Sequence, residues 1–442
     1  MSKIIVLGGG ESGVGAALLA KSKGFDVFLS DQGALKESFK KTLLDHQIRF
    51  EEGQHTLEEI LSAQEVIISP GIPEKNEVVK KIKEKNISLV SEIEFAVRYT
   101  SAKIIAITGS NGKTTTTLLT FHLLKEAGFS VGLAGNIGQS FAKQVLENKH
   151  DHYVLEISSF QLDRCFLFKP DVAVLLNITP DHLDRYDYKF ENYTASKFRI
   201  FQQAELGKTS IFWEDDEVIQ ANKRLIPASN FRTISSKNKN SDAYISQDKI
   251  SLSTGEIDLK SAPIQGPHNA INMSAAILAA QAVGISLEKI KELLPSFHNA
   301  PHRLEPCGLS NGVQFINDSK ATNVDAVFYA LNSFNQPIIL ILGGVDKGNE
   351  YEVLDKLVKK KVKGLICLGK DNEKLMTHFS DLCEAIFPTD DLQIAVQKAL
   401  EWGHEGDVVL LSPACASFDL FKNYEDRGDQ FKHIVSQLTH GN

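Results

Sequence analysis

A strand pattern rich in β-branched residues begins anew at three points of the 442-residue chain. The first start covers residues 3–7, the second covers residues 103–107, and the third follows Ala300-Pro301. In each segment, short apolar strands alternate with helical patterns, and this alternation predicts a parallel sheet that binds ligands at the carboxyl ends of its strands. A chain of this length also exceeds what one hydrophobic core usually supports. The sequence therefore predicts an α/β protein with three domains, at residues 1–92, 93–299 and 300–442.

The expected elements follow from apolar periodicity and from glycine and proline at their ends. Strands are predicted at residues 3–7, 26–30, 65–69, 87–90, 103–107, 131–134, 153–157, 172–178, 313–317, 337–342, 364–368 and 408–411. Helices are predicted at residues 14–23, 74–85, 115–127, 266–280, 324–331 and 351–359, with a polar surface loop at residues 235–241.

Composition excludes several classes of protein. The net charge of -8 argues against a nucleic-acid surface, because proteins that follow phosphate backbones concentrate Lys and Arg. The five cysteines are an odd number without a Cys-x-x-Cys pair, which is typical of a reducing compartment and of neither a disulfide framework nor a zinc site. No apolar stretch has the length of a membrane span, and the apolar run near the N-terminus is too short for a secretory signal. We expect a soluble, cytoplasmic monomer without a membrane or nucleic-acid partner.

The second glycine turn, Thr108-Gly-Ser-Asn-Gly-Lys-Thr114, lies between a predicted strand and a predicted helix. In this position successive backbone N–H groups and the helix N-terminus can bind phosphate oxygens, while Lys113 neutralises the outer phosphates. Thr114 can then ligate Mg²⁺ through its hydroxyl. The common phosphate loop needs glycine at the position of Ile107, so this loop is a shortened variant. The segment predicts a site for ATP.

Two further polar residues follow or end predicted strands of the same domain. Glu156 ends the apolar run at residues 153–155, where a buried strand has no ordinary use for a charge. It is either a core acid paired with a base or a Mg²⁺ ligand. His182 follows another strand, although a single histidine is more often structural than catalytic.

The first glycine turn, Gly8-x-Gly10-x-x-Gly13, follows a strand, and Asp31 closes the next strand. This spacing matches the dinucleotide-binding fingerprint, in which glycines allow the backbone to approach a diphosphate. On its own, the fingerprint indicates an NAD-dependent oxidoreductase.

Several segments together resemble the ordered motifs of the Mur ligases. They are the loop at residues 108–114, Leu155-Glu-Ile-Ser-Ser-Phe-Gln161, Asp181-His-Leu-Asp-Arg185, Tyr193-Thr-Ala-Ser-Lys197, His268-Asn-Ala-Ile-Asn272, Pro301-His-Arg303, Asn317-Asp-Ser-Lys-Ala-Thr-Asn323 and the segment from Leu411 to Gly428. The last of these resembles the members of the family that add D-glutamate, and the Asp-Asn-Pro-Arg sequence of the diaminopimelate-adding type is not found. The resemblance covers essentially the whole chain.

The resemblance implies a Rossmann-like N-terminal domain that binds UDP, a central ATPase domain of the phosphate-loop type with a parallel sheet, and a Rossmann-like C-terminal domain that binds the amino acid. It also implies an ATP-dependent ligase that joins D-glutamate to UDP-N-acetylmuramoyl-L-alanine through an acyl phosphate and releases ADP and phosphate. ATP is a co-substrate in this scheme, and Mg²⁺ occupies two sites.

Site residues are carried over by the same resemblance. The implied catalytic residues are Lys113, Glu156, His182 and Lys197, and the implied metal ligands are Thr114, Glu156, His182 and Lys197. An ammonium cannot bind a cation, so Lys197 is expected to be carbamylated; from the sequence alone it is also compatible with a solvated positive helix face. The implied ATP-binding residues are Gly109, Ser110, Asn111, Gly112, Lys113, Thr114, Thr115, Asn269, Asn272, Arg303 and Asp318.

The implied contacts of the UDP-linked substrate are Gly10, Glu11, Ser12, Gly13, Asp31, Gly71, Asn136 and His182. The implied D-glutamate contacts are Lys320, Thr322, Lys347, Ser417, Phe418 and Tyr424. Alternatives remain open: a related ligase for another amino acid, a folylpolyglutamate-type enzyme, a non-catalytic nucleotide sensor, and an NAD-dependent oxidoreductase. The last is disfavoured because a dehydrogenase has no role for the ATP loop or the third domain.

Overall fold

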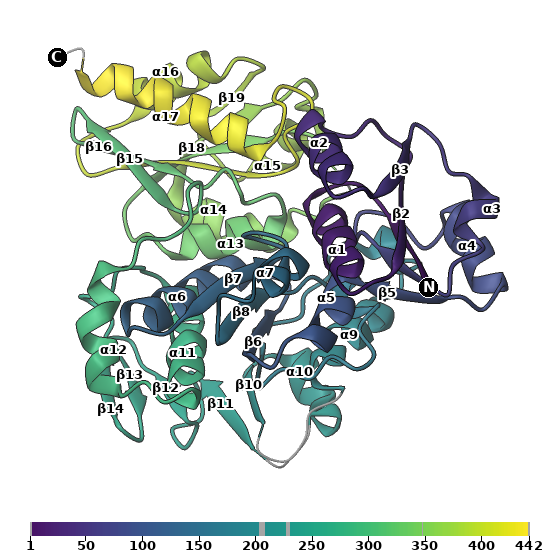
Figure 1. Cartoon of the computed structure of the whole chain (residues 1–442). Coiled ribbons are helices and arrows are strands. Elements are labelled where there is room, and N and C mark those ends of the chain that lie inside the picture. Colours follow the sequence, from purple (N-terminus) through teal and green to yellow (C-terminus); the bar gives the residue numbers. More distant parts are fainter. Residues whose placement is uncertain (1, 203–207, 227–229, 347, 441–442) are drawn as a thin grey trace. The chain divides into compact units, whose positions relative to one another are not determined.

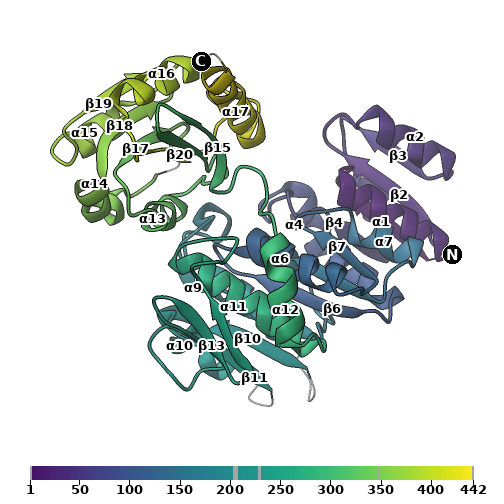
Figure 2. The same ribbon diagram turned by 90° about the vertical axis from the view of Figure 1, so that its left-hand side faces the viewer.

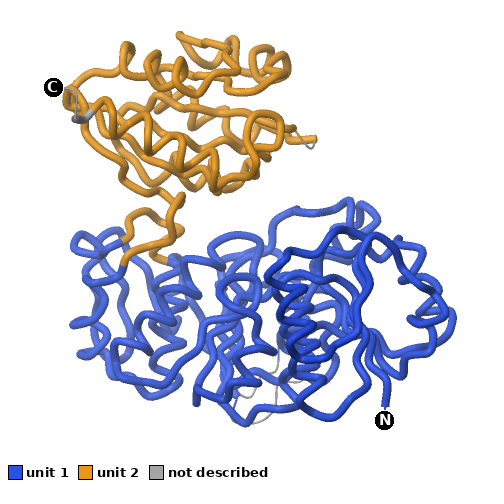
Figure 3. Tube along the Cα trace, turned by 45° about the horizontal axis from the view of Figure 1, so that its top comes forward, with its two compact units in different colours: residues 1–263, 271–297 blue, residues 264–270, 298–442 orange. Residues whose placement is uncertain are grey.

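The computed structural model describes residues 2–202, 208–226, 230–346 and 348–440 and, within these ranges, contains three mainly parallel sheets with helices between the strands (Figure 1). The α/β fold class predicted from the sequence is confirmed. The chain forms two compact units, residues 1–263 with 271–297 and residues 264–270 with 298–442 (Figure 3). We call them unit 1 and unit 2 and describe each by itself.

The N-terminal sheet is parallel throughout and has the strand order β3-β2-β1-β4-β5. Its strands are β1 (Lys3–Leu7), β2 (Asp26–Asp31), β3 (Arg49–Glu52), β4 (Glu65–Ile68) and β5 (Ser88–Ser91). Its helices are α1 (Glu11–Ser22), α2 (Glu37–Asp45), α3 (Leu57–Ile60), α4 (Glu77–Glu84) and α5 (Glu92–Ala96). Because the strands are parallel, the turns that follow β1, β2 and β4 meet at the same edge.

The central sheet has the strand order β14-β13-β12-β11-β10-β9-β6-β8-β7. Its strands are β6 (Lys103–Thr108), β7 (Val131–Gly135), β8 (His152–Glu156), β9 (Val172–Leu175), β10 (Thr209–Trp213), β11 (Phe231–Ser235), β12 (Ala243–Ile245), β13 (Lys249–Leu252) and β14 (Gly255–Asp258). Strands β12 to β14 form an antiparallel edge on this otherwise parallel sheet. Strands β12 to β14 are short, with tight turns between them, so the alternation of apolar and polar residues that predicts a strand is weak there.

The helices of the central sheet include two that pack beside each other. They are α6 (Lys113–Glu126), α7 (Phe141–Glu147), α8 (Ser159–Leu162), α9 (Phe190–Phe198), α10 (Glu217–Ala221), α11 (Pro267–Ala282) and α12 (Leu287–Leu293). His122 of α6 hydrogen-bonds to the carbonyl of Leu293 and contacts the ring of Phe297, so α6 and α12 lie side by side (Figures 1 and 2).

One continuous apolar core joins the N-terminal and central sheets. It contains Val6 and Ala16 from the first sheet and its helix α1, together with Phe95 of α5, Ala106 of β6 and Phe141 of α7. A Cβ atom built on Gly15 of α1 would lie 1.9 Å from the Ser140 hydroxyl oxygen, so α1 and α7 approach closely at this point. The two sheets therefore form one compact unit, and the boundary at residue 92 stays a prediction.

Unit 2 contains the third sheet, with the strand order β15-β16-β20-β17-β18-β19, in which only β15 is antiparallel to its neighbour among the described strands. The strands are β15 (Glu305–Ser310), β16 (Val313–Asn317), β17 (Ile338–Gly343), β18 (Val362–Leu368), β19 (Ile386–Thr389) and β20 (Val408–Ala414). The helices are α13 (Val324–Asn332), α14 (Asp355–Lys361), α15 (Glu373–Phe379), α16 (Leu392–Trp402) and α17 (Tyr424–His440).

Apolar cores cover both faces of this third sheet. Val327 of α13 and Val358 of α14 belong to the core on one face, whereas Val396 of α16 and Phe431 of α17 belong to the core on the other (Figure 2). The predicted helix at residues 351–359 corresponds to a 3₁₀ turn, Glu352–Leu354, followed by α14. Among the described helices, none is both long and apolar enough to span a membrane.

Candidate active site

The glycine loop between β6 and α6 has a backbone that only glycine adopts readily. Gly112 precedes α6 with φ +84°, in the left-handed region. A Cβ at this position would also lie 2.2 Å from the side-chain oxygen of Asn272. The loop leads directly into the N-terminus of α6, where N–H groups and the helix dipole favour a phosphate. Thr114 and Thr115 are buried in the first turn of α6.

Residues of the segment after β9 and of α9 hold this loop in place. The side-chain oxygen of Asn177 accepts a hydrogen bond from the Asn111 N–H at 2.8 Å, and its amide donates to the Asn111 carbonyl at 3.1 Å. The Ser110 hydroxyl donates to the Thr179 carbonyl at 2.9 Å and lies 3.0 Å from the Tyr193 hydroxyl. Asn177 was not predicted as a site residue. Its one signal in the sequence was a polar amide directly after a buried strand.

Two lysines share one acceptor at the start of the loop. The ammonium nitrogen of Lys113 donates to the carbonyls of Gly109 at 2.8 Å and Ser110 at 2.7 Å. That of Lys197, on α9, donates to the same Gly109 carbonyl at 2.9 Å. Lys197 is buried, not part of a solvated helix face. Its burial holds the pKa of Lys197 well below the ordinary lysine value, and the nearby charge of Lys113 lowers it further.

Glu156 ends β8 on the same edge of the sheet, with its side chain buried. One carboxylate oxygen accepts a hydrogen bond from the Asn136 amide at 2.7 Å. The other, Oε2, has no hydrogen-bond partner in the part of the chain that the structure describes. A buried carboxylate oxygen left in this state fits a cation. No preformed group of three or more His, Cys, Asp or Glu is found within the described residues.

His182 lies in a left-handed conformation, with φ +52°, on the loop after β9. Its ring contacts the edge of Phe160, with centroids 5.3 Å apart, and its Nε2 lies 3.5 Å from an oxygen of Asp181. Burial and the charges of Lys113 and Lys197 lower the pKa of His182, while Asp181 opposes them. The neutral imidazole is the form that can bind a metal ion.

Lys113, His182 and Lys197 line one pocket of about 380 Å³ in unit 1. Five residues of the sequence prediction line it: Gly71, Lys113, Asn136, His182 and Lys197. Its other lining residues are Pro70, Ser158, Ser159, Phe160, Asp181, Arg185 and Tyr193, which were not predicted as site residues. Besides His182, the pocket is lined by the basic side chains of Lys113, Lys197 and Arg185 and by the carboxylate of Asp181. Lys113 and Arg185 are groups that can bind an anionic ligand. We call it the lysine pocket.

The N-terminal glycine turn, at the start of α1, lies outside the lining of the lysine pocket. Gly13 is required by packing, because a Cβ there would lie 1.8 Å from the carbonyl oxygen of Gly8. The carboxylate of Asp31 accepts hydrogen bonds from the N–H groups of Gly9 and Gly33 and thus shapes the turn. Glu11 and Ser12 begin α1, next to Gly10. A Cβ at Gly10 would meet nothing within 4 Å.

In unit 2, the predicted ATP contact Asp318 is buried at the end of β16. Its carboxylate accepts hydrogen bonds from the Ser412 hydroxyl at 2.8 Å and the Leu304 N–H at 3.2 Å. Burial raises the pKa of Asp318 to about 7, although these bonds and the charge of Arg303 oppose the shift. Asn269 and Asn272 are both buried on α11, and the Asn269 amide donates to the Gln265 carbonyl.

Two segments of unit 2 carry the predicted D-glutamate contacts. The ammonium of Lys320 lies 5.4 Å from the ring centroid of Tyr424, Ser417 is buried, and Phe418 is 70% exposed. Thr322 follows Lys320 on the same loop, whereas Lys347 lies outside the described residues.

Arg427, which was not predicted, ties these two segments together. It is buried and donates to the Ser319 hydroxyl at 2.9 Å, the Ser319 carbonyl at 2.8 Å and the Cys415 carbonyl at 3.3 Å. Its burial lowers the pKa of Arg427 to about 10. The guanidinium therefore fixes the segment before Lys320 against the segment before Ser417.

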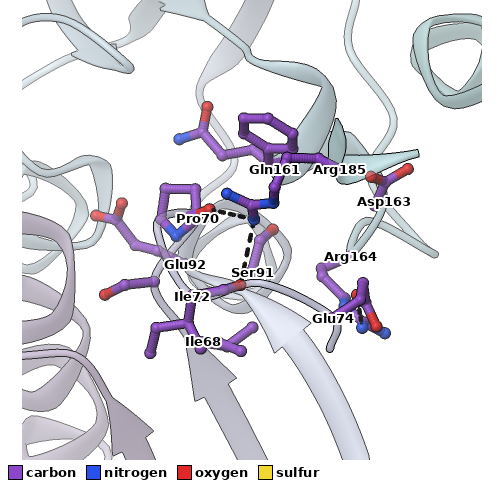
Figure 4. Close-up of a pocket in the computed structure, with 12 residues that line it drawn as sticks. Ile68, Pro70, Ile72, Glu74, Ser91, Glu92, Gln161, Asp163, Arg164 and Arg185 are labelled. Carbon is purple, nitrogen blue, oxygen red and sulfur yellow. Dashed lines mark hydrogen bonds and ion pairs between the residues drawn. The ribbon is translucent and has the colours of Figure 1, made fainter. Parts of the chain in front are cut away.

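A second, smaller pocket of about 30 Å³ lies beside the lysine pocket, between the N-terminal and central sheets (Figure 4). Both pockets are lined by Pro70, Phe160 and Arg185. The smaller pocket also contains the ion pair between Arg164 and Glu74, which connects the same two sheets.

Three family models match successive parts of the chain. Residues 3–78 match the MurD N-terminal domain, residues 107–280 match the Mur ligase middle domain, and residues 302–415 match the Mur ligase glutamate ligase domain.

Full-length relatives extend these matches. The chain is 52% identical over 446 residues to the UDP-N-acetylmuramoylalanine--D-glutamate ligase of Cytophaga hutchinsonii, with 99% of each chain covered. It is 48% identical over 447 residues to the ligase of the same name from Bacteroides fragilis, covering 99% of this chain and 100% of the relative. The MurF ligase of Thermotoga maritima in complex with ADP shares the fold, with a TM-score of 0.65 at 17% identity over 96% of this chain and 99% of that one.

Proposed function

Because the chain belongs to the Mur ligase family, we propose that it joins D-glutamate to UDP-N-acetylmuramoyl-L-alanine at the expense of ATP, in the synthesis of peptidoglycan precursors. The relatives with about half of their residues identical are ligases for this reaction by name. One structural observation carries the proposal. Lys113 of the phosphate loop lines the same pocket as Pro70 and Gly71, which belong to the turn after β4 of the N-terminal sheet.

The reaction needs an activated acyl group, because a free carboxylate has no adequate leaving group. An oxygen of the alanyl carboxylate forms a bond to the γ-phosphorus of ATP, and the bond from that phosphorus to the β-phosphate oxygen breaks to release ADP. The amine of D-glutamate then attacks the acyl carbon. The C–N bond forms, the C–O bond to phosphate breaks, and the amine loses a proton.

Positioning and charge neutralisation account for most of the catalysis in such a transfer. Lys113 and the N–H groups of residues 109–115 bind the ATP phosphates in this proposal. Lys113 now donates to the Gly109 and Ser110 carbonyls, so it exchanges these acceptors for phosphate oxygens when ATP binds.

Mg²⁺ fits the donors on this edge of the sheet. Thr114 and Glu156 form one proposed site, and His182 with carbamylated Lys197 forms the second. The partnerless oxygen of Glu156 and the buried amine of Lys197 support this assignment. When bound, Mg²⁺ supplies neutralisation of the phosphate charge. An intact mass of the active protein about 44 Da above the sequence mass, the mass of CO2, is the expected sign of carbamylation when it is measured at neutral pH, and Lys197→Ala should abolish it.

Unit 2 supplies the remaining ATP contacts and the amino acid site in the proposal. Arg303 binds phosphate and Asp318 lies near the ribose, together with Asn269 and Asn272 of α11. The D-glutamate carboxylates bind Lys320, Thr322, Lys347, Ser417, Phe418 and Tyr424, because a dicarboxylate calls for a lysine together with hydroxyl and backbone donors.

The N-terminal sheet holds the UDP end of the substrate in this assignment. The Gly10 to Gly13 turn binds the diphosphate, Asp31 lies near the uridine, and Asn136 reaches the sugar. An NAD-dependent oxidoreductase is not supported, because the relatives and the matched families are ligases throughout. We propose that the enzyme acts as a cytoplasmic monomer.

A phosphate-release assay tests the function. The protein, ATP, Mg²⁺ and UDP-N-acetylmuramoyl-L-alanine are combined with D-glutamate, L-alanine, L-lysine or diaminopimelate. Phosphate release with D-glutamate alone is expected, together with a product whose mass equals the two substrates minus water. Release with another amino acid only, or none with D-glutamate, would overturn the proposal.

A further inference from the structure

Arg185 connects the two sheets of unit 1 at the rim of the lysine pocket. It lies on the loop that carries His182, in the central part of the chain, and one nitrogen, Nη2, donates to the carbonyls of Pro70 at 3.3 Å and Ile72 at 3.4 Å (Figure 4). Both acceptors belong to the turn after β4 of the N-terminal sheet. Arg185 thus holds that turn against the loop of His182.

The aromatic ring of Phe160 fixes the guanidinium from a second direction. The guanidinium carbon of Arg185 lies 4.3 Å from the Phe160 ring centroid, a distance at which a cation is attracted by the face of a ring. Phe160 stacks in turn on Tyr186, with the ring planes 12° apart, and contacts the ring of His182. The position of Arg185 is therefore defined by packing as well as by hydrogen bonds.

Arg185 forms no ion pair within the described residues, although the carboxylates of Glu74, Asp163 and Asp181 line the same two pockets. Among these residues its hydrogen bonds are made by Nη2, and Nε and Nη1 make none. Three of its five N–H groups, one on Nε and two on Nη1, remain for a ligand, and each can donate a charge-assisted hydrogen bond to a carboxylate or phosphate oxygen.

We propose that Arg185 positions the UDP-linked substrate: it fixes the Pro70 to Ile72 turn on the pocket rim and binds an anionic group of the substrate with its remaining N–H groups. The inference rests on the proposed function, since it assumes that the lysine pocket receives this substrate. The anionic group is either the diphosphate or the alanyl carboxylate. In both cases Arg185 links binding on the N-terminal sheet to the loop of His182.

Arg164 provides a matched control. It also joins the central part of the chain to the turn after β4, through its ion pair with Glu74, and it lines the smaller pocket. It is absent from the lining of the lysine pocket. Arg164→Ala therefore removes one contact between the same two sheets without removing a group that faces the substrate.

The experiment compares Arg185→Ala, Arg185→Lys and Arg164→Ala in the phosphate-release assay, with KM measured for each of the three substrates. We expect Arg185→Ala to raise KM for the UDP-linked substrate about 10- to 100-fold, the usual effect of losing hydrogen bonds to a charged group. KM for ATP and for D-glutamate should change less than about threefold. Arg185→Lys keeps the charge but has fewer N–H donors, so it cannot hold the turn and the ligand together and an intermediate rise is expected. Arg164→Ala should leave all three KM values within about threefold.

A purely structural role predicts something else: lower thermal stability in both alanine variants and no selective change in KM. That result, or an equal rise of all three KM values, would overturn the inference. If wild-type protein releases no phosphate with any amino acid, the proposed function fails first and the KM comparison is not reached. In that case the affinity for the UDP-linked substrate, measured by calorimetry on the same variants, still tests Arg185. Unchanged affinity in Arg185→Ala refutes its role.

Titration with UDP alone separates the two possible anionic groups. A loss of affinity in Arg185→Ala for both UDP and the complete substrate assigns the diphosphate. A loss for the complete substrate only assigns the alanyl carboxylate. Equal affinities of wild type and variant for both ligands contradict the proposal.

Discussion

The two glycine loops of unit 1 follow the same order of strand, turn and helix, but they carry opposite charges. The loop before α1 has Glu11 in the first helical turn, and the carboxylate of Asp31 holds its Gly9 N–H. The loop before α6 begins its helix with Lys113 and has Lys197 on its carbonyl. The first arrangement suits a ligand that is bound without reacting, whereas the second suits a phosphate at which negative charge develops during transfer. A backbone motif alone therefore does not define what a loop does.

The largest effect is expected at the second loop. Lys113→Ala should lower kcat about 10²- to 10³-fold, because it removes a charge that is placed where negative charge develops. The rate of phosphate release measures it, and the urea midpoint should stay near that of wild type. A rate within tenfold of wild type would show that the charge of Lys113 does not give the second loop a catalytic role that the first loop lacks.

The negative charge of Glu11 at the first loop also acts on Glu92 of α5, which should make the stability of the protein depend on pH. Glu92 is buried at the junction of α5 and α7, and its burial raises its pKa to about 7, with Glu11 adding to the shift. A raised carboxyl pKa gives stability that is fully present below the unfolded value of 4.5 and is lost as pH rises through 7. The loss amounts to about 3 kcal/mol.

Glu92→Gln removes this titration while keeping an acceptor for the Ser140 hydroxyl and the Ala142 N–H. The stability of the variant relative to wild type should increase from pH 5 to pH 8, as measured by urea denaturation at both values. Asp318 titrates in the same direction but is present in both proteins, so the difference isolates Glu92. A difference that is independent of pH would contradict the assignment.

Packing of the first loop predicts a contrast between two of its glycines. Gly13→Ala places a methyl group against the Gly8 carbonyl and should cost about 1–3 kcal/mol of stability, whereas Gly10→Ala meets open space. Thermal denaturation of the two variants compares them directly. Equal melting temperatures would mean that the turn can relax around Gly13.

The smallest effect is expected at Glu11. Glu11→Gln removes a negative charge beside the proposed diphosphate site, so KM for the UDP-linked substrate should fall by up to about threefold. The same change removes a favourable charge from the N-terminus of α1 and should lower stability by about 0.5 kcal/mol. Initial rates at low and high salt measure the first effect, which should shrink with salt. A rise in KM would show that Glu11 helps binding.

The sequence predicted the parts of the site that lie in one short segment. Lys113 and Gly112 follow from a strand, a turn and a helix in succession, and Glu156 follows from a charge at the end of an apolar strand. Asn177 and Arg185 were missed, because their partners Asn111 and Pro70 lie 66 and 115 positions away along the chain. No local pattern shows such pairings.

The fold follows the same rule. Most of the buried parallel strands were predicted close to their observed positions, since apolar runs with glycine at their ends are strong patterns. The parallel strands β10 and β11 of the central sheet were missed, although β10 is buried. The edge strands β13 and β14 were not predicted, because each is short and half exposed. Lys197 shows the opposite case: its immediate sequence indicates a solvated helix face, and only its tertiary contacts with the phosphate loop bury it.

The apolar core shared by the N-terminal and central sheets also has a thermodynamic consequence. Elements that bury the same side chains unfold together, so the two sheets form one cooperative folding unit. A ligand that binds only to the turns of β1 and β4 therefore stabilises the ATP-binding sheet as well, by about 2.7 kcal/mol at a concentration one hundred times its Kd. Ligand binding at the N-terminal sheet in this way makes the central sheet more rigid.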